Sequence, residues 1–203
     1  MRRTKEEAEQ TRLHIIKAAL TLFSRDGYSH TTLAMIAKEA GYSRGPIYWH
    51  FRNKDHLYQA VLAYSQSPLE NLVINASAET DNPLKTIETF ACDWLDLLVN
   101  DAWFRQSFEI LLNKTELTSE MADTLKRERE LTRRIIDTLT HLIQAAQAQA
   151  LIPSAQAPGQ LALVTYTYLM GITQSWLFAP RLFSLKKERG FFVARLRGLL
   201  EQA

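Results

Sequence analysis

Residues 31–54 read TTLAMIAKEAGYSRGPIYWHFRNK, and this stretch decides the fold. Apolar residues recur at the spacing of one helical face over about 32–40, at Leu33, Ile36, Ala37 and Ala40. Gly41 suits the left-handed residue after a helix, and Ser43 can cap a short helix over about 44–50. Two helices joined by a tight glycine turn form a helix-turn-helix, although the same spacing also fits an ordinary helical hairpin.

The flanking segments complete a small helical domain. Residues 5–26 predict a helix that Gly27 ends, and its apolar face carries Ile16, Ala19, Leu20 and Phe23. Downstream, Asn53 can cap a fourth helix, which Pro68 is expected to interrupt or kink. Ile47 and Phe51 are four residues apart, so we expect both to face the core of this domain.

The remainder of the chain continues the helical pattern. Further helices are expected over 84–99, 102–114, 118–150, 159–178 and 184–201. No β-type alternation of useful length is present. The prediction is an all-α protein of about nine helices. Residues 1–56 would form a three-helix helix-turn-helix domain and residues 57–203 a helical ligand-binding and dimerisation bundle, with the fourth helix linking them from about residue 53.

Charge is distributed unevenly along the chain. The net charge is +2, but residues 1–56 hold ten Lys and Arg against six Asp and Glu. A basic first domain on a mildly acidic body suggests a polyanionic partner for that domain, although solvated charge is the usual explanation.

Several classes of protein are disfavoured by the sequence. No run of 18 uncharged apolar residues is present and the first residues do not resemble a signal peptide, so we expect a cytoplasmic protein without a membrane segment. The single cysteine, Cys92, excludes an internal disulfide and a thiolate zinc cluster. Neither a catalytic motif nor a metal-ligand spacing of histidines is present, so we expect no enzyme activity, no cofactor and no metal.

The run from Ser43 to Lys54 resembles the signature of the tetracycline-repressor (TetR) family. Thr31 to Ala37, the Gly41 turn and the opening Arg2-Arg3-Thr4-Lys5 also fit, and the similarity is closest to the AcrR- and TtgR-like repressors of multidrug efflux. The resemblance covers about residues 2–62. It implies a homodimer in the bacterial cytoplasm, associated with the nucleoid, whose third helices read double-stranded DNA. It also implies a C-terminal domain that binds a small molecule and thereby weakens DNA binding.

The expected DNA-binding residues lie on or beside the short helix. Arg44 can make a bidentate contact to guanine, and Gly45 lets the backbone approach the duplex. Pro46 replaces the alanine or threonine usual in similar repressors. The polar tips of Tyr48, Trp49 and His50 can reach phosphates or bases, and Lys54 and Thr32 can hold phosphate at helix starts. The full predicted set is Arg3, Lys5, Thr32, Ser43, Arg44, Gly45, Tyr48, Trp49, His50 and Lys54.

The body of the protein is expected to bind a hydrophobic, aromatic or cationic effector. The predicted lining residues are Phe90, Trp94, Phe108, Glu109, Leu112, Asn113, Tyr166 and Met170. Aromatic residues at helical spacing also fit an ordinary core, and Glu109 also fits a surface pair with Arg105. The apolar last two helices predict a four-helix dimer interface. Its predicted contacts are Leu163, Tyr166, Leu169, Phe191 and Leu196.

These expectations define a repressor that a small-molecule effector releases from a pseudo-palindromic operator, and the resemblance implies that it controls multidrug efflux. The alternative is an architectural or replication-linked DNA-binding protein of the same fold without an effector.

Overall fold

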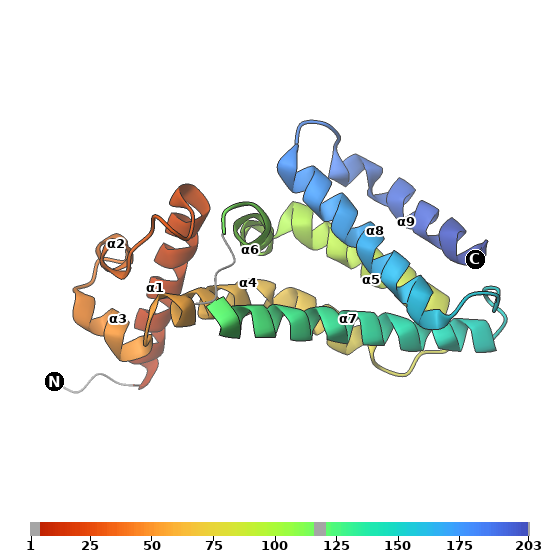
Figure 1. Cartoon of the computed structure of the whole chain (residues 1–203), viewed down its shortest axis with the longest axis horizontal. Coiled ribbons are helices and arrows are strands. Elements are labelled where there is room, and N and C mark those ends of the chain that lie inside the picture. The colour runs from red at the N-terminus through yellow and green to blue at the C-terminus, as the bar shows by residue number, and fades with distance from the viewer. Residues whose placement is uncertain (1–4, 116–120, 203) are drawn as a thin grey trace. The chain divides into compact units, whose positions relative to one another are not determined.

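Helices form the regular structure of residues 5–115 and 121–202, the part of the chain that the computed structural model describes (Figure 1). In chain order they are α1 (Lys5–Asp26), α2 (Leu33–Glu39), α3 (Arg44–His50), α4 (Lys54–Ala76), α5 (Pro83–Asn100), α6 (Ala102–Asn113), α7 (Ala122–Ala148), α8 (Pro158–Phe178) and α9 (Leu185–Glu201). Within these described ranges there are nine helices and no strand. The predicted all-α architecture is confirmed.

Local chemistry accounts for several helix ends. Gly27 has a φ of +81° and stops α1, as expected. The Asn82 side chain accepts a hydrogen bond from the Lys85 N–H at 2.9 Å, and Pro83 occupies the first turn of α5, where its missing N–H has no helical partner to lose.

Pro68 is expected to interrupt or kink the fourth helix; the interruption is wrong, and the kink stays a prediction. α4 continues from Lys54 to Ala76 with Pro68 inside it. A proline within a helix costs about 3 kcal/mol, because it removes one backbone hydrogen bond and crowds the preceding turn. Leu69 and Val73, in the next turn, are almost completely buried. Burial of two such side chains contributes roughly 3–6 kcal/mol, enough to offset the proline.

The helices pack into two compact units. The first comprises Met1–Gln66 and Trp103–Glu128, and the second comprises Ser67–Ala102 and Arg129–Ala203. Residues 57–66, 103–115 and 121–128 therefore belong to the same unit as the N-terminal helices, whereas the predicted domain boundary lies after residue 56. The division into functional domains 1–56 and 57–203 stays a prediction.

The core of the first unit is built from five helices and from residues beside them, among them Tyr28 and Met121. Its fully buried members include Ile16, Phe23, Ile36, Ile47 and Tyr58, together with Ile110 of α6 and Met121. Residues far apart in sequence thus close one hydrophobic core around α1, α2 and α3.

The second unit is organised around α5, which contacts both α8 and α9 (Figure 1). Trp94 of α5 is 1% exposed, and its Nε1–H donates to Thr173 Oγ1 of α8 at 3.0 Å. Arg189 and Arg197 of α9 form ion pairs with Asp96 and Glu88 of α5. α9 is therefore held to α5 by charge as well as by apolar packing.

Candidate nucleic-acid interface

α3 presents two surfaces of opposite character. Ile47 is fully buried and Phe51, the residue that ends the helix, is 1% exposed, which confirms that both face the core. Tyr48 and Trp49 are instead 60% and 72% exposed. Adjacent large aromatic side chains left in water on a seven-residue helix indicate a surface that another molecule covers. Arg44 and Gly45 are exposed as well.

A rigid turn sets α3 against α2. Gly41 has a φ of +74°, and its N–H donates to the Lys38 carbonyl at 3.1 Å. The next N–H, of Tyr42, donates to the Ala37 carbonyl at 2.9 Å. These two bonds make a Schellman motif, which satisfies the last carbonyls of α2. The predicted helix-turn-helix is therefore present, with its glycine in the left-handed conformation.

The two capping residues of this motif differ in their bonding. Thr32 Oγ1 accepts a hydrogen bond from the Met35 N–H at 3.2 Å, as expected of an N-cap. Ser43 occupies the N-cap position of α3, but its hydroxyl makes no capping hydrogen bond. Both residues are exposed, and their contacts with DNA stay predictions.

The start of α4 is capped as predicted. Asn53 Oδ1 accepts from the His56 N–H at 2.8 Å, and His56 Nδ1 accepts from the Arg52 N–H at 3.2 Å. Lys54 Nζ donates to the Tyr28 carbonyl at 2.9 Å and lies 4.1 Å from the centre of the Tyr28 ring. The lysine thus has an internal role that its position in sequence did not suggest, and its phosphate contact stays a prediction.

The remaining DNA-binding candidates lie at the ends of the motif. Lys5 is the first residue of α1 and is exposed, whereas Arg3 lies outside the described residues. His50, the last residue of α3, is half-buried and meets the Trp49 ring edge-on at 4.4 Å. That contact holds the Trp49 ring beside the end of the helix.

Residues 110–115, from a distant part of the chain, brace the end of α1, the loop after it and the first turns of α4. The Lys114 carbonyl accepts the Tyr28 N–H at 3.2 Å, and its Nζ donates to the Ser24 carbonyl at the end of α1. Thr115 Oγ1 lies 2.9 Å from the Tyr58 hydroxyl, whose pKa is raised by burial. Helical spacing does not predict these contacts, because it shows which face of a helix is buried but not which other segment packs against that face.

The eight predicted ligand-binding residues divide between the two units. Phe108, Glu109, Leu112 and Asn113 lie on α6 in the first, and Phe90, Trp94, Tyr166 and Met170 lie on α5 and α8 in the second. Glu109 forms an ion pair with Lys114 at 3.0 Å. Phe90 lines a pocket of about 320 Å³ with Leu72 and Thr89. A single cavity formed by all eight stays a prediction.

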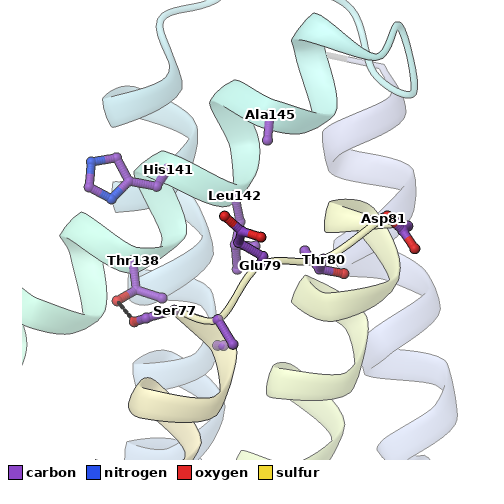
Figure 2. Close-up of a pocket in the computed structure, with 10 residues that line it drawn as sticks. Ser77, Glu79, Thr80, Asp81, Thr138, His141, Leu142 and Ala145 are labelled. Carbon is purple, nitrogen blue, oxygen red and sulfur yellow. Dashed lines mark hydrogen bonds between the residues drawn. The ribbon is translucent and has the colours of Figure 1, made fainter.

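A larger pocket of about 660 Å³ lies in the second unit (Figure 2). One wall is the segment after α4, with Ser77, Glu79, Thr80 and Asp81, and the other is α7, with Thr138, His141, Leu142 and Ala145. Ser77 Oγ and Thr138 Oγ1, 3.0 Å apart, join the two walls. Its size lies within the range of small-molecule sites. The sequence carries no signal for these residues, because polar residues after a helix resemble any surface loop.

The residues predicted for the dimer interface differ in exposure. Leu163 and Phe191 are 49% and 57% exposed, and Tyr166 is half-buried. Leu169 and Leu196 are each 1% exposed, so they pack inside the protomer and present almost no surface to a partner. The pairing of two chains stays a prediction, supported on this face by Leu163 and Phe191.

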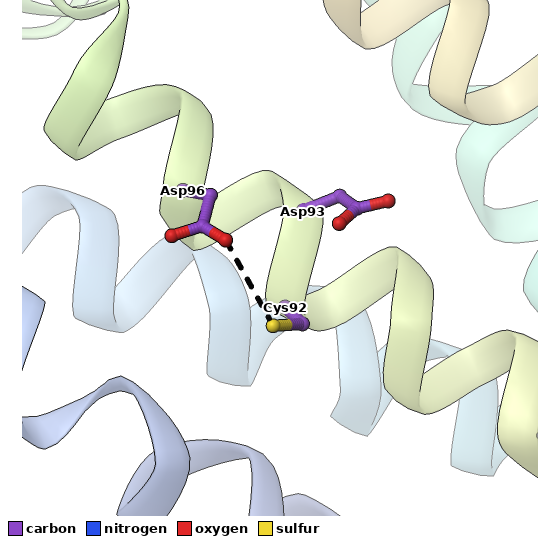
Figure 3. A group of neighbouring side chains, drawn as sticks. All are labelled: Cys92, Asp93 and Asp96. Carbon is purple, nitrogen blue, oxygen red and sulfur yellow. Dashed lines mark hydrogen bonds between the residues drawn. The ribbon is translucent and has the colours of Figure 1, made fainter.

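Cys92, Asp93 and Asp96 form a small polar cluster on α5 (Figure 3). One ligand atom from each lies within 4.8 Å of the others, a spacing that could hold a metal ion. Arg189 already pairs with Asp96, however, and supplies a positive charge to the cluster. Partial burial raises the pKa of Asp93 and of the Cys92 thiol, so the thiol stays protonated at neutral pH. Within this cluster, Asp96 fastens α5 to α9 through its ion pair with Arg189.

In residues 5–115 and 121–202, none of the helices combines the length and the hydrophobicity that a membrane span requires.

Comparison with known proteins gives two family matches. Residues 15–61 match the bacterial regulatory proteins of the tetR family, and residues 82–201 match the C-terminal region of MAATS-type transcriptional repressors. The first match covers the helix-turn-helix, and the second covers most of the remaining chain.

Individual relatives align over nearly the whole length. The HTH-type transcriptional regulator AcrR of Shigella flexneri is 37% identical over 200 residues, 96% of this chain and 91% of that protein. The HTH-type transcriptional regulator TtgR of Pseudomonas putida is 34% identical over 181 residues, 89% and 86% of the two chains.

A solved structure agrees with these relatives. The crystal structure of NalD, the secondary repressor of the MexAB-OprM multidrug efflux pump in Pseudomonas aeruginosa, superposes with a TM-score of 0.85 at 28% identity. The superposition covers 95% of this chain and 96% of NalD. The resemblance seen in the sequence is confirmed: the chain belongs to the TetR family of bacterial transcriptional regulators.

Proposed function

We propose that the chain is a homodimeric repressor that binds a pseudo-palindromic DNA operator in the bacterial cytoplasm and is released by a small-molecule effector. The observation that carries the proposal is the exposed face of α3, where Arg44, Tyr48 and Trp49 stand out from a rigid helix-turn-helix. Similarity to AcrR and TtgR along most of the chain, and to a structure described as an efflux-pump repressor, supports control of a multidrug efflux system. We assign no catalytic activity.

The roles at the DNA follow from side-chain chemistry. Arg44 donates two hydrogen bonds to guanine in the major groove, and Gly45 allows close approach of the backbone. Thr32, Ser43, Tyr48, Trp49, His50 and Lys54 position the helix on phosphates and base edges, with Lys5 and Arg3 as a basic arm.

The pocket of about 660 Å³ is the site we propose for the effector. Glu79 and Asp81 line it together with apolar surface from Ala76, Leu142 and Ala145. Among the ten described residues that line it there is no lysine or arginine. Such a lining favours an amphipathic organic cation, because carboxylates attract its charge and the apolar wall accepts its rings.

Selection of bound duplexes from a random DNA pool tests the proposal. We expect a pseudo-palindrome with half-sites about one helical turn apart. Arg44→Ala should relax one base position in each half-site, at a cost of about 1–3 kcal/mol. Arg133→Ala, which removes an exposed α7 arginine that pairs with Glu130 in a surface ion pair, is the matched control and should select the wild-type sequence.

Two other outcomes would contradict parts of the proposal. Enrichment of no sequence, with binding lost at modest salt, would reject a sequence-specific regulator. A selected operator from which no organic cation or aromatic drug releases the protein would favour the effector-free architectural alternative.

A further inference from the structure

The turn between α2 and α3 carries a polar pair outside the DNA-binding residues named above. The Tyr42 hydroxyl lies 3.0 Å from His14 Nδ1 of α1, and the two rings stack with centroids 6.4 Å apart and planes 20° apart. His14 is exposed. Tyr42 is half-buried, and its ring packs against the core of the first unit. The pair therefore joins the surface of α1 to the turn that precedes α3.

The backbone holds Tyr42 in a fixed place relative to α3. Its N–H is bonded to the Ala37 carbonyl in the Schellman motif, and the following residue, Ser43, is the N-cap of α3. The backbone of Tyr42 therefore lies directly before the start of α3, the helix proposed to approach the bases, while its hydroxyl lies against His14 of α1. Tyrosine hydroxyls are among the groups that commonly bind phosphate oxygens and so fix a protein's register on DNA.

We propose that the Tyr42 hydroxyl binds a backbone phosphate of the operator, and that His14 is the positioning residue that orients it. The inference rests on the proposed DNA-binding function and extends the contact surface from α3 across the turn to α1.

The pairing chemistry explains why a histidine serves here. When His14 carries a proton on Nδ1, it donates to the Tyr42 oxygen, and the tyrosine O–H proton is then directed outward to a phosphate oxygen. In the other neutral tautomer the tyrosine donates to Nδ1, and its proton is used internally. A phosphate at the turn selects the first arrangement.

Fluorescence anisotropy with the selected operator tests this contact. Tyr42→Phe keeps the ring and removes the hydroxyl, and we expect about tenfold weaker binding per half-site, the scale of a hydrogen bond to a charged group. The measurement is repeated on duplexes in which one phosphate at a time is a neutral methylphosphonate. At one phosphate of each half-site, the methylphosphonate should make wild type and Tyr42→Phe bind equally. The neutral group removes from the wild-type complex the same hydrogen bond that the variant lacks.

Variants of His14 separate positioning from contact. His14→Ala should weaken binding severalfold in the wild-type background and have no effect in the Tyr42→Phe background. His14→Asn should restore most of the affinity, since an amide can replace Nδ1. Tyr168→Phe, which removes a hydroxyl bond to the Phe192 carbonyl in the second unit, is the matched control and should bind as wild type does.

The outcomes distinguish this contact from the function on which it rests. If wild type selects no operator, the proposed function has failed. If an operator is selected but the Tyr42→Phe penalty is the same on every methylphosphonate duplex, the pair is only a brace inside the protein and the phosphate contact is rejected. Thermal unfolding of each variant shows whether it is folded before binding is measured.

Discussion

Lys114 connects the segment after α6 to the end of α1, which lies about 90 residues earlier in the chain. Its ammonium group meets the Ser24 carbonyl at the end of α1 and the Glu109 carboxylate, while its own carbonyl accepts the Tyr28 N–H. A cation at the C-terminal end of a helix satisfies a carbonyl that has no helical partner and is attracted by the helix dipole. Lys114 therefore caps α1 from outside the helix.

Replacing Lys114 by methionine should destabilise the protein by about 1–2 kcal/mol, because the aliphatic stem stays while the hydrogen bond and the ion pair are lost at a partly exposed site. The free energy of unfolding, measured by urea denaturation, gives this difference. Lys114→Arg, which keeps a cationic donor, should lose less. Equal stability of all three proteins would show that the carbonyl of Ser24 is satisfied equally well by water.

Lys54 and Glu109 show where inference from sequence stops at this scale. A cation in the first turn of α4 suggests a phosphate partner, yet the structure gives Lys54 the carbonyl and ring of Tyr28, 26 residues away. Helical spacing fits Glu109 to Arg105, one turn back, and does not suggest the ion pair that Glu109 forms with Lys114. Helical spacing identifies neighbours within one helix, and neither of these observed partners lies in the same helix.

At the scale of elements, the turn from α2 to α3 is set by backbone conformation rather than by crowding. A Cβ atom at Gly41 would meet no atom within 4 Å, so space is available for a side chain. The φ of +74° is nevertheless unfavourable for any residue with a Cβ. The need for glycine here is therefore purely conformational.

Gly41→Ala should cost about 1–2 kcal/mol of stability for this reason. Gly45→Ala is the matched control, because that glycine lies within α3, has no left-handed φ and also has open space around its Cβ position. The control should be as stable as wild type or slightly more stable, since alanine favours a helix. Thermal unfolding of both proteins checks this, and equal losses would contradict a purely conformational origin.

The order of the helices is predictable from the sequence because each has an apolar stripe and local caps. Thr32 and Asn53 cap the helices expected of them, and Ile47 faces the core. The pattern does not assign Met121 or the inward face of α6 to the core of the first unit. An apolar face shows that a helix is buried, but not which helices it packs against. At Pro68 a local preference gives the wrong expectation: the cost of a proline inside a helix is outweighed by burial of the residues that follow it.

At the scale of the whole molecule, α8 and α9 leave apolar side chains in water. Leu163, Val164, Phe191 and Leu199 are all exposed by more than 40%. An isologous interface between two copies of the chain would cover this surface and would set the spacing of two DNA-reading helices.

Phe191→Glu should convert the predicted dimer to monomers at micromolar concentration, because it replaces an apolar contact by a carboxylate whose removal from water is costly even with Arg195 one turn away. Sedimentation velocity measures this directly. Lys187→Glu, an exposed change of charge on the same helix, should leave the dimer intact. A wild-type protein that sediments as a monomer would contradict the dimer itself, whereas a dimeric Phe191→Glu protein would move the interface elsewhere.

Replacement of the DNA-reading head of this chain is constrained by the way Ile110 and Met121 enter the core around α1. A graft limited to residues 1–66 would leave two large apolar side chains of the recipient facing a core that did not evolve with them. The mismatch would cost stability through cavities or overpacking. A chimeric protein should therefore carry three crossovers, after residue 66, before residue 103 and after residue 128. The segment that completes the core is then transferred together with the DNA-reading helices.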